Sequence, residues 1–286
     1  MSIAWVNVMI ILKKFNNNAV VVDKNGHEVV VMGNGLGFGV SKGDVVDENK
    51  IEKTFVLTES NQNILINTLS DVPSEYLELT QEIIAFVEHD LGYKFNEYFL
   101  LSLSDHLYHA ILRNNRGENV KNPLRNEIKK IYPKEYSTSK KIVNLIFEKK
   151  NIIFDDDEAT FITLHLVNGQ QNLLSSKFEV QTVPRMVKDI LKIVEFHFSV
   201  ELNKNNVYYD RFLSHLKTFI ERILNENQYN ERENDSIFFD DLKQKDHQCY
   251  ECVKKIVSYI KNKQNINISE DEKFYLFVYL YRITNQ

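Results

Sequence analysis

The chain has 286 residues, of which 43% are hydrophobic, and its formal net charge at pH 7 is −5. This length predicts two or three domains, and the hydrophobic fraction is large enough for buried cores. The negative charge argues against a protein that binds nucleic acid through bulk electrostatic attraction, although it does not exclude a small local site. Only four prolines and nine glycines, beside many Leu, Ile, Lys and Glu, predict a mostly helical protein.

No apolar run approaches the roughly 20 residues that a membrane-spanning helix needs. The apolar stretch 1–12 lacks the basic leader and the cleavage site of a secretion signal, so we expect a cytoplasmic protein without direct membrane insertion. The two cysteines, Cys249 and Cys252, suggest a reducing compartment. Their Cys-x-x-Cys spacing also occurs in redox and zinc sites, but the chain has no second pair and no βαβ pattern around them, which favours a buried structural role.

The first 58 residues differ from the rest of the chain, because they hold six of the nine glycines and alternate hydrophobic and polar positions. Short β-branched runs predict four antiparallel strands, at about 10–15, 19–22, 27–32 and 53–57, and the turn sequence 23–26 predicts a hairpin. A sheet of this size has little core of its own. We therefore expect it to form a dimer in which one sheet packs on its symmetry mate.

Glycines occupy every second position after the third predicted strand: Gly33, Gly35, Gly37 and Gly39. In an extended chain they would leave one face bare for the close approach of another backbone or of a ligand, while Asn34, Leu36 and Phe38 would project from the opposite face. The pattern is not a dinucleotide fingerprint, because no helix opens after it, and it lacks the Gly-Lys-Ser/Thr ending of a P-loop.

Two interpretations of this glycine segment stay open. In the first it is a nucleic-acid platform, where Phe38 stacks on a base, asparagines contact base edges, and Lys13, Lys14 and Lys42 meet phosphates. In the second it is an ordinary glycine-rich hairpin within a dimer. The first 58 residues contain six lysines and six acidic residues, so their charges cancel and do not decide between the two interpretations.

From about residue 68 the chain turns helical and contains two similar halves. The pattern His-Leu-x-x-x-Ile-x-Arg occurs at 106–113 and again at 215–222, so its two histidines are 215 − 106 = 109 positions apart. Asp155-x-x-Glu158 and Ser269-x-x-Glu272 are similarly matched helix starts of the capping-box type. We predict a duplicated helical bundle, with domains at 1–60, 68–174 and 175–286.

The histidines of the two halves are the candidate functional residues. On a helix His106 and Arg113 share one face, and His215 and Arg222 repeat this arrangement, whereas His165 would lie on a second helix of the first bundle. Each histidine could instead be a partly buried structural residue. No acidic ligand stands at a diagnostic metal-binding spacing, and no cofactor motif is present, so we expect no cofactor.

At this point the sequence resembles a known family, the BglG/SacY-type transcriptional antiterminators of the bacterial phosphotransferase system, and in particular its LicT-like members. The resemblance extends from about Met9 to the end of the chain. The segments that carry it are 16–18 (Asn-Asn-Asn), 30–38 (Val-Val-Met-Gly-Asn-Gly-Leu-Gly-Phe), 51–53 (Ile-Glu-Lys), 104–106 (Ser-Asp-His), 164–168 (Leu-His-Leu-Val-Asn) and 212–216 (Phe-Leu-Ser-His-Leu).

The resemblance implies a multi-domain α+β protein: a small four-stranded antiparallel RNA-binding domain, dimeric, followed by two all-α PTS regulation domains. Such a protein is not an enzyme; it binds a hairpin in an mRNA leader and prevents formation of a terminator. The residues expected to bind RNA are Lys13, Asn16, Asn18, Gly33, Asn34 and Phe38.

By the same resemblance, His106 and His165 accept phosphoryl groups through the sugar permease (enzyme II), which inhibits, and His215 accepts one from the phosphocarrier protein HPr, which activates. Arg113 and Arg222 are candidate partners of these phosphates. A DNA-binding activator built on the same regulation domains is the alternative, disfavoured because no helix-turn-helix precedes the duplicated unit. A metal or redox protein that uses the cysteines and histidines is a second alternative.

The chain departs from the family pattern at three places. Tyr279 stands where the family has a second histidine in the second regulation domain, so activation there is expected to depend on His215 alone. Asn34 replaces a common arginine of the glycine loop, which removes one RNA contact. Residues 1–8 precede the usual start of the family, so we expect translation to begin at Met9.

Overall fold

In the computed structural model the described residues are 9–56, 69–96, 98–170, 179–204, 206–225 and 235–284, with the side chains of 235–238 left aside. The expected start at Met9 concerns residues 1–8, and the expected domain boundary between residues 174 and 175 falls within 171–178. Both segments lie outside the described residues. The chain divides into two compact units. One comprises Met1–Val120, Asn144–Phe154 and Gly169–Gln171; the other comprises Lys121–Val143, Asp155–Asn168 and Asn172–Gln286.

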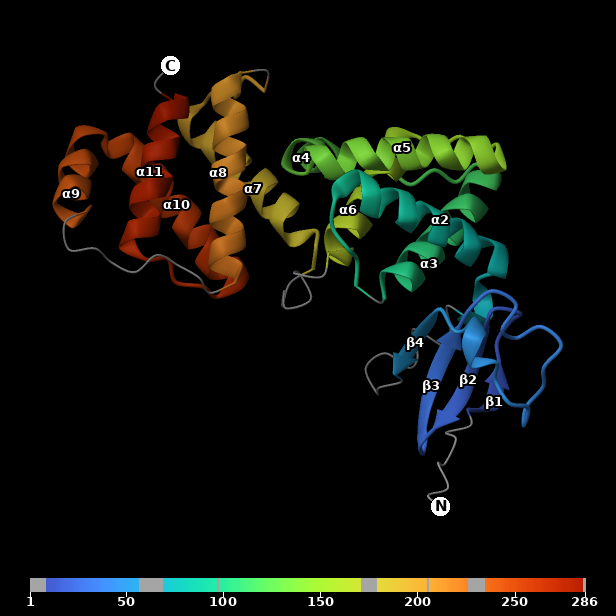
Figure 1. Cartoon of the computed structure of the whole chain (residues 1–286). Helices are drawn as coiled ribbons and strands as arrows, with labels where there is room; N and C mark the ends of the chain where they lie inside the picture. The colour runs from blue at the N-terminus through green and yellow to red at the C-terminus, as the bar shows by residue number, and fades with distance from the viewer. Residues whose placement is uncertain are drawn as a thin grey trace. The chain divides into compact units, whose positions relative to one another are not determined.

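The N-terminal region forms the predicted four-stranded antiparallel sheet, in the order β1-β2-β3-β4 (Figure 1). Its strands are β1 (Ile10–Lys14), β2 (Ala19–Lys24), β3 (His27–Met32) and β4 (Lys53–Val56). The hairpin prediction is confirmed: Asn25 and Gly26 both have positive φ, of 58° and 80°, as a two-residue type I′ turn requires. The Asp23 carboxylate accepts a hydrogen bond from the Gly26 N–H at 2.7 Å and so supports the turn.

Both faces of the central strands are buried. One face carries a small cluster of hydrophobic side chains: Met9, Ile11, Val20, Val22, Val29, Val31, Leu36 and Val46. On the other face Val21, Val30 and Phe55 are buried as well, and the Phe55 ring lies 6.1 Å from that of Tyr98. The sheet therefore has a larger hydrophobic core than its four short strands predicted, because segments of the same unit outside the strands supply part of that core.

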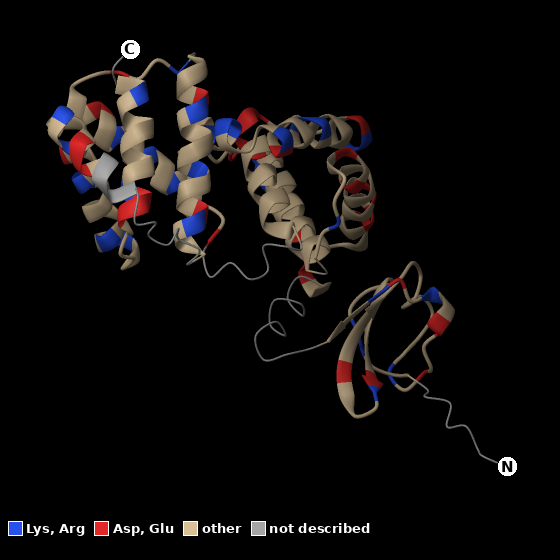
Figure 2. Ribbon diagram, turned by 60° about the vertical axis from the view of Figure 1, so that its left-hand side comes forward, with Lys and Arg blue, Asp and Glu red and all other residues tan. Residues whose placement is uncertain are grey.

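The elements that follow the sheet are α-helices, as predicted, and one short 3-10 helix, Glu48–Lys50, lies between β3 and β4. The helices are α2 (Ser74–Leu91), α3 (Phe99–Asn115), α4 (Arg125–Ile131), α5 (Pro133–Lys150), α6 (Asp156–Gly169), α7 (Thr182–Phe198), α8 (Val207–Leu224), α9 (Asp235–Lys245), α10 (His247–Gln264) and α11 (Glu270–Thr284). Acidic and basic residues are interspersed along them (Figure 2). This matches the near-balanced charge of the sequence.

Local sequence signals fix several helix ends. Asn206 precedes α8 and its side chain accepts a hydrogen bond from the Tyr208 N–H, which caps the helix. The side chain of Asp155 accepts from the Asp157 and Glu158 N–H groups, and that of Ser269 from the Glu272 N–H, so both predicted helix starts are capped. Gly92 ends α2 in the left-handed conformation, with φ of 77°.

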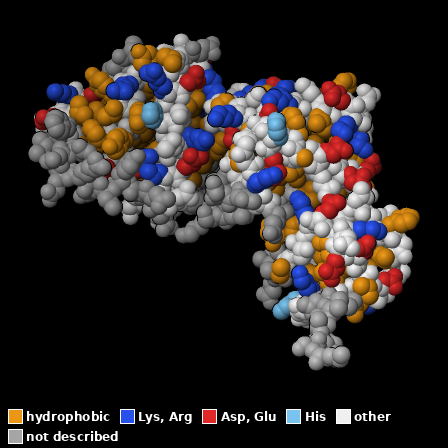
Figure 3. Space-filling view, viewed as in Figure 1, with side chains coloured by type: hydrophobic (Ala, Val, Ile, Leu, Met, Phe, Trp, Pro, Cys, Tyr) orange, Lys and Arg blue, Asp and Glu red, His pale blue; other side chains and the backbone are white. Residues whose placement is uncertain are grey.

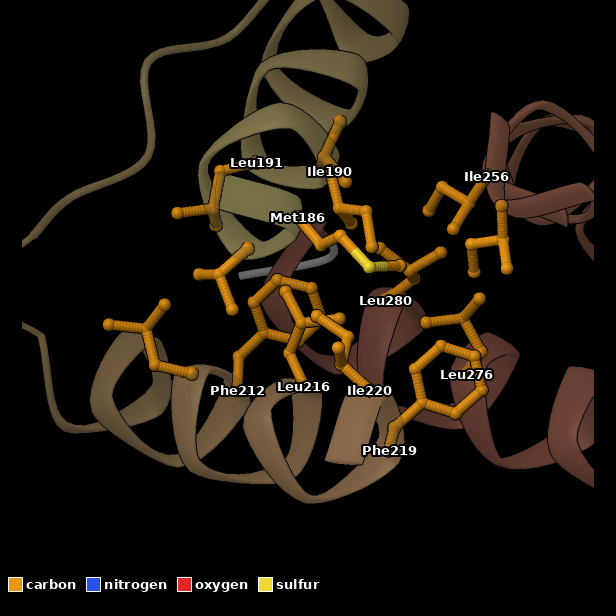
Figure 4. Packing of buried hydrophobic residues seen from close by; sticks show 14 of the residues in the cluster. Met186, Ile190, Leu191, Phe212, Leu216, Phe219, Ile220, Ile256, Leu276 and Leu280 are labelled. Atoms are coloured by element: carbon orange, nitrogen blue, oxygen red, sulfur yellow. The ribbon is translucent and has the colours of Figure 1, made fainter. Parts of the chain in front are cut away.

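The second unit contains a large hydrophobic core. Side chains from α7, α8, α10 and α11 meet in it, among them Met186, Ile190, Phe212, Leu216 and Leu280 (Figure 4). Leu216 is 2% exposed and Ile190 and Leu280 are fully buried. Because α8 contributes every third or fourth residue to this core, its intervening positions, including that of His215, face outward.

The two cysteines lie on α10 and are completely buried. Burial raises the pKa of both thiols to about 12, and the Cys249 thiol donates to the Phe277 carbonyl at 3.6 Å. Thiols in this state are poor nucleophiles and poor metal ligands, which favours the structural role. Among the described residues, no group of three or more His, Cys, Asp and Glu is placed to hold a metal ion, and no helix has the length and apolar character needed to cross a membrane.

Candidate nucleic-acid interface and histidine sites

The glycine segment after β3 is folded into turns, so the expectation of an extended chain was wrong. Gly35 and Gly39 have positive φ, of 64° and 71°. Hydrogen bonds from Leu36 N–H to Gly33 O and from Phe38 N–H to Gly35 O, both 3.1 Å, close consecutive turns. The alternating glycines supply the left-handed positions that these turns require, a need that period-two reasoning did not distinguish from an open face.

The other two glycines are required by the protein's own backbone. A Cβ atom on Gly33 would lie 1.7 Å from the Lys50 carbonyl oxygen, and one on Gly37 would lie 2.3 Å from that of Asn16. Both distances are far below van der Waals contact, so no other residue fits without moving the loop. The predicted close approach is therefore found, and at these two positions the approaching group is another segment of the same chain.

The turns separate the three side chains that were expected to project together. Asn34 is exposed and Phe38 is 74% exposed, whereas Leu36 is only 3% exposed and belongs to the sheet core. The expectation that Leu36 projects was wrong, because a turn places residues two apart on opposite sides. Singly exposed hydrophobic side chains are normal on protein surfaces. Phe38 is a candidate contact because its ring stands on a loop that the chain's own backbone anchors.

The 16–18 turn anchors the glycine loop. Asn18 donates its N–H to the Asn16 side chain at 2.8 Å, accepts at its backbone oxygen from the Gly33 N–H at 2.9 Å, and accepts at Oδ1 from the Gly35 N–H at 2.9 Å. The structure therefore brings Asn16, Asn18 and Gly33 together in the loop that bears Asn34 and Phe38. Lys13 is exposed on β1 and lies over the Phe15 ring, 4.9 Å from its centroid.

Two acidic residues also contact this loop. The side chain of Asn18 donates to Glu78 of α2 at 2.9 Å, and the Asn34 N–H donates to Glu52 at 3.3 Å. Asn18 is itself only 9% exposed. The two carboxylates accept these hydrogen bonds and so help to hold the loop, and sequence reasoning gave no role to either glutamate.

The histidines of the first half occupy helices α3 and α6. His106 and Arg113 are both half-buried on α3, and His165 is half-buried on α6. Ser104, next to His106, is fully buried, while His109 is exposed and lies 3.6 Å from Asp105. Helix packing therefore fixes the predicted acceptors His106 and His165 more firmly than the neighbouring His109.

His215 is exposed on α8 and stacks on Tyr279 of α11, with ring centroids 3.9 Å apart and planes 15° apart. Burial of part of the ring lowers the pKa of His215, and the positive charges of Arg282 and Arg211 lower it further. The imidazole is therefore neutral at neutral pH and carries a free lone pair on one nitrogen, as a phosphoryl acceptor needs. Tyr279, the departure from the family pattern, is the residue that supports this ring.

Arg222, two turns beyond His215, is engaged elsewhere. Its Nε and Nη2 atoms donate to the two carboxylate oxygens of Glu272 at 2.5 and 2.6 Å. The Glu272 side chain is completely buried and that of Arg222 is 17% exposed. A carboxylate buried to this extent depends on its guanidinium partner.

Sequence reasoning missed two other arginines near His215. Arg211 stands four residues before it on α8, and Arg282 stands three residues after Tyr279 on α11; both are exposed. The i, i+4 and i, i+3 spacings carried the signal, but only the packing of α8 against α11 shows that the two arginines border the same histidine.

Comparisons with known proteins agree with this domain order. The family model for the "CAT RNA binding domain" matches residues 9–63, and the model for the "PRD domain" matches residues 81–169 and 188–283. The CAT domain occupies the place where a DNA-binding activator would need a helix-turn-helix. The repeated PRD match confirms the predicted duplication.

Two relatives that match this chain over nearly their whole length show the same relationship. The "Transcription antiterminator LicT" of Bacillus subtilis (strain 168) is 37% identical over 280 residues, which are 97% of this chain and 100% of the relative. The "Beta-glucoside operon antiterminator" of Dickeya chrysanthemi is 34% identical over 97% of this chain and 98% of the relative. A crystal structure of GlcT CAT-PRDI has 29% identity and a TM-score of 0.49 and covers 58% of this chain and 99% of that one. On the family models and the full-length relatives, the chain belongs to the transcription antiterminators that carry a CAT RNA-binding domain followed by two PRD domains.

Proposed function

We propose that this chain is a sugar-responsive transcriptional antiterminator, which binds a hairpin in an mRNA leader and prevents formation of a terminator. The observation that carries the proposal is the exposed Phe38 on the anchored glycine loop, within the segment that matches the CAT RNA-binding family. An aromatic ring held in solvent offers a stacking surface for an unpaired base. Lys13, Asn34 and the half-buried Asn16 complete the proposed RNA-binding surface, and the buried Asn18 and Gly33 hold the loop that presents it.

The RNA-binding sheet works as a homodimer in this proposal, and the domains span 1–60, 68–174 and 175–286. A two-fold dimer matches the expectation that two sheets together hold one RNA hairpin more tightly than either alone. The partners are an mRNA leader and proteins of the phosphotransferase system, so the chain acts in the cytoplasm. It is not an enzyme, because it accepts phosphoryl groups without turning over a substrate.

Phosphorylation of histidines controls the proposed switch. The sugar permease (enzyme II) phosphorylates His106 and His165, and HPr phosphorylates His215. In each transfer the neutral imidazole attacks phosphorus, a new N–P bond forms while the N–P or S–P bond to the donor breaks, and the proton lost by the acceptor ring leaves with the donor or solvent. The exposed and neutral state of His215 supports this role.

The experiment is to incubate the full chain with phosphorylated HPr, and separately with a phosphorylated permease domain, and to map phosphohistidine by mass spectrometry. We expect His215 to be labelled by HPr, and His106 and His165 by the permease. His109→Ala is the control, since His109 is exposed on the same helix as His106 and has no proposed role. Labelling that is lost in His109→Ala, or that reaches none of the three acceptors, would contradict the assignment.

A further inference from the structure

A hollow of about 220 Å³ opens between α8 and α11 beside His215. Its lining includes Tyr208, Arg211 and Phe212 of α8 and Tyr279 and Arg282 of α11. Figure 3 shows hydrophobic side chains interspersed with Lys and Arg side chains on the half of the molecule that contains α8 and α11. The stacked rings of His215 and Tyr279 form one wall, so the histidine faces the space with its ring held in a defined orientation.

The charged side chains that line this hollow are all positive. Its lining contains two guanidinium groups and no carboxylate. Burial of part of the ring lowers the pKa of His215, and the positive charges of the two arginines lower it further. A phosphoryl group adds about −1.5 to −2 charges near neutral pH, which two guanidinium groups would balance.

Arg222 is less suited to this task, although it repeats the spacing of Arg113 from His106. Seven residues of α-helix separate it from His215, about 10 Å along the axis. Its guanidinium also holds the buried Glu272, whose carboxylate would be left without its cation if Arg222 turned toward a phosphate. Arg211 is one helical turn from His215, and among the described residues no ion pair joins it to a buried carboxylate.

We propose that the hollow is a phosphate-binding site, in which Arg211 and Arg282 hold the phosphoryl group carried by His215 while Tyr279 keeps the imidazole in place. The inference rests on the proposed function, since it takes His215 as a phosphoryl acceptor. It adds the residues that receive the phosphate, and it replaces Arg222 in that role. Because Arg211 belongs to α8 and Arg282 to α11, a phosphate bound to both joins the two helices through one anion.

The test uses the full chain and a small phosphoryl donor, potassium phosphoramidate, so that it does not depend on HPr. After labelling, the lifetime of phosphate on His215 is followed at mildly acidic pH by quantitative peptide mapping. In hydrolysis water adds to phosphorus, the N–P bond breaks, and the ring nitrogen leaves with a proton. Guanidinium groups that hold the phosphate and oppose ring protonation slow this step.

We expect the Arg211→Gln/Arg282→Gln variant to lose phosphate from His215 several-fold faster than the wild type, and the Arg211→Lys/Arg282→Lys variant to recover part of the lifetime. Before labelling, the pKa of His215 measured by NMR should be higher in the Gln variant, because two positive charges are gone. Arg185→Gln is the matched control, since it removes an exposed arginine of α7 outside the hollow. Circular dichroism verifies that each variant is folded.

Equal lifetimes in the wild type and the Arg211→Gln/Arg282→Gln variant would overturn the site, and so would an equal loss in Arg185→Gln. Failure of phosphoramidate to label His215 at all would overturn it too. If HPr fails to label His215 while phosphoramidate labels it and the phosphate lifetime depends on the two arginines, the result would support the phosphate-binding site and contradict HPr as the donor. The two failures are therefore distinguishable.

Discussion

Phe38 and Asn34 reach solvent because the residues around them are tied down. Gly33 and Gly37 pass within contact of the Lys50 and Asn16 backbones, and Asn18 bonds the loop at two amides. A loop held in this way loses little conformational entropy when it binds a ligand. Its exposed ring is thus preorganised for stacking.

Phe38→Ala should weaken RNA binding and leave the fold intact. Stacking of one base on an aromatic side chain contributes about 1–3 kcal/mol, and the 74% exposed ring contributes little to the core. Val56→Ala is the control, because Val56 is also exposed, at 58%, on β4 of the same sheet. RNA titration and thermal unfolding of both variants check this; equal loss of affinity in Val56→Ala would contradict a specific role of the ring.

Tyr279→His should restore a second acceptor in the second regulation domain. The substituted ring would occupy the wall of the same hollow, beside His215 and Arg282. Intact-mass analysis after treatment with phosphorylated HPr should show one additional phosphoryl group relative to the wild type. Tyr281→His, at an exposed position of the same helix, is the control and should add none. A second phosphoryl group in the control would show that exposure alone is sufficient.

Single residues differ in how far the sequence determines them. Asn25-Gly26 has one favoured turn, so the hairpin could be predicted. The burial of Leu36 could not be predicted, because whether its side chain projects or enters the core depends on the turns that its neighbours form. Arg211 and Arg282 were missed for a related reason: each lies beside the ring it borders only after α8 and α11 pack.

The starts of α6 and α11 show what a local sequence pattern predicts and what only tertiary packing determines. Both capped starts, at Asp155 and Ser269, were predicted from the capping pattern. At α11 the glutamate of the pattern is completely buried and holds Arg222. Glu272 pairs with a residue of a different helix, a partner that local spacing cannot reveal.

Arg222→Ala should destabilise the protein by about 3–5 kcal/mol, because it leaves the carboxylate of Glu272 buried without its cation. Lys254→Ala is the control: it removes an exposed helical pair with Glu251 and should change stability little. Urea unfolding followed by circular dichroism measures both. A similar small effect for the two variants would mean that solvent reaches Glu272.

Asp156→Asn should lower stability at neutral pH and matter less in acid. Hydrogen bonds from Lys129 and Lys140 hold the pKa of Asp156 well below its usual value. A carboxyl group with a lowered folded-state pKa contributes stability above its unfolded pKa of about 3.9 and loses it as the pH falls toward the folded value. The contribution is at most about 1 kcal/mol, because the side chain is 41% exposed and solvent screens the pair.

Thermal unfolding of the wild type and Asp156→Asn from about pH 7 down to about pH 2 measures this dependence, with the exposed Asp241→Asn of α9 as control. The difference in melting temperature between wild type and Asp156→Asn should shrink as the pH falls below about 4. A difference that is constant with pH would show that the ion pairs with Lys129 and Lys140 are not its source.

Over the whole chain, a domain with an exposed aromatic loop is followed by two PRD segments that carry the proposed phosphoryl acceptors. The duplicated pattern could be predicted because the paired histidine motifs survive at nearly constant offset. The burial of the second face of the sheet could not be predicted, because it depends on contacts between residues that are distant in sequence, such as Phe55 and Tyr98. The central claim of the proposed function is that the sheet binds RNA and that phosphorylation of the histidines in the PRD segments controls this binding.

RNA binding by the full chain is the most direct test of that claim. The protein would be titrated against a labelled RNA hairpin from the leader of its own gene, and against a DNA of the same sequence, at two salt concentrations, with its oligomeric state followed in parallel. We predict that a dimer binds the RNA, that affinity falls as salt rises, and that the DNA binds far more weakly. Equal binding to RNA and DNA, or binding to neither, would contradict the account.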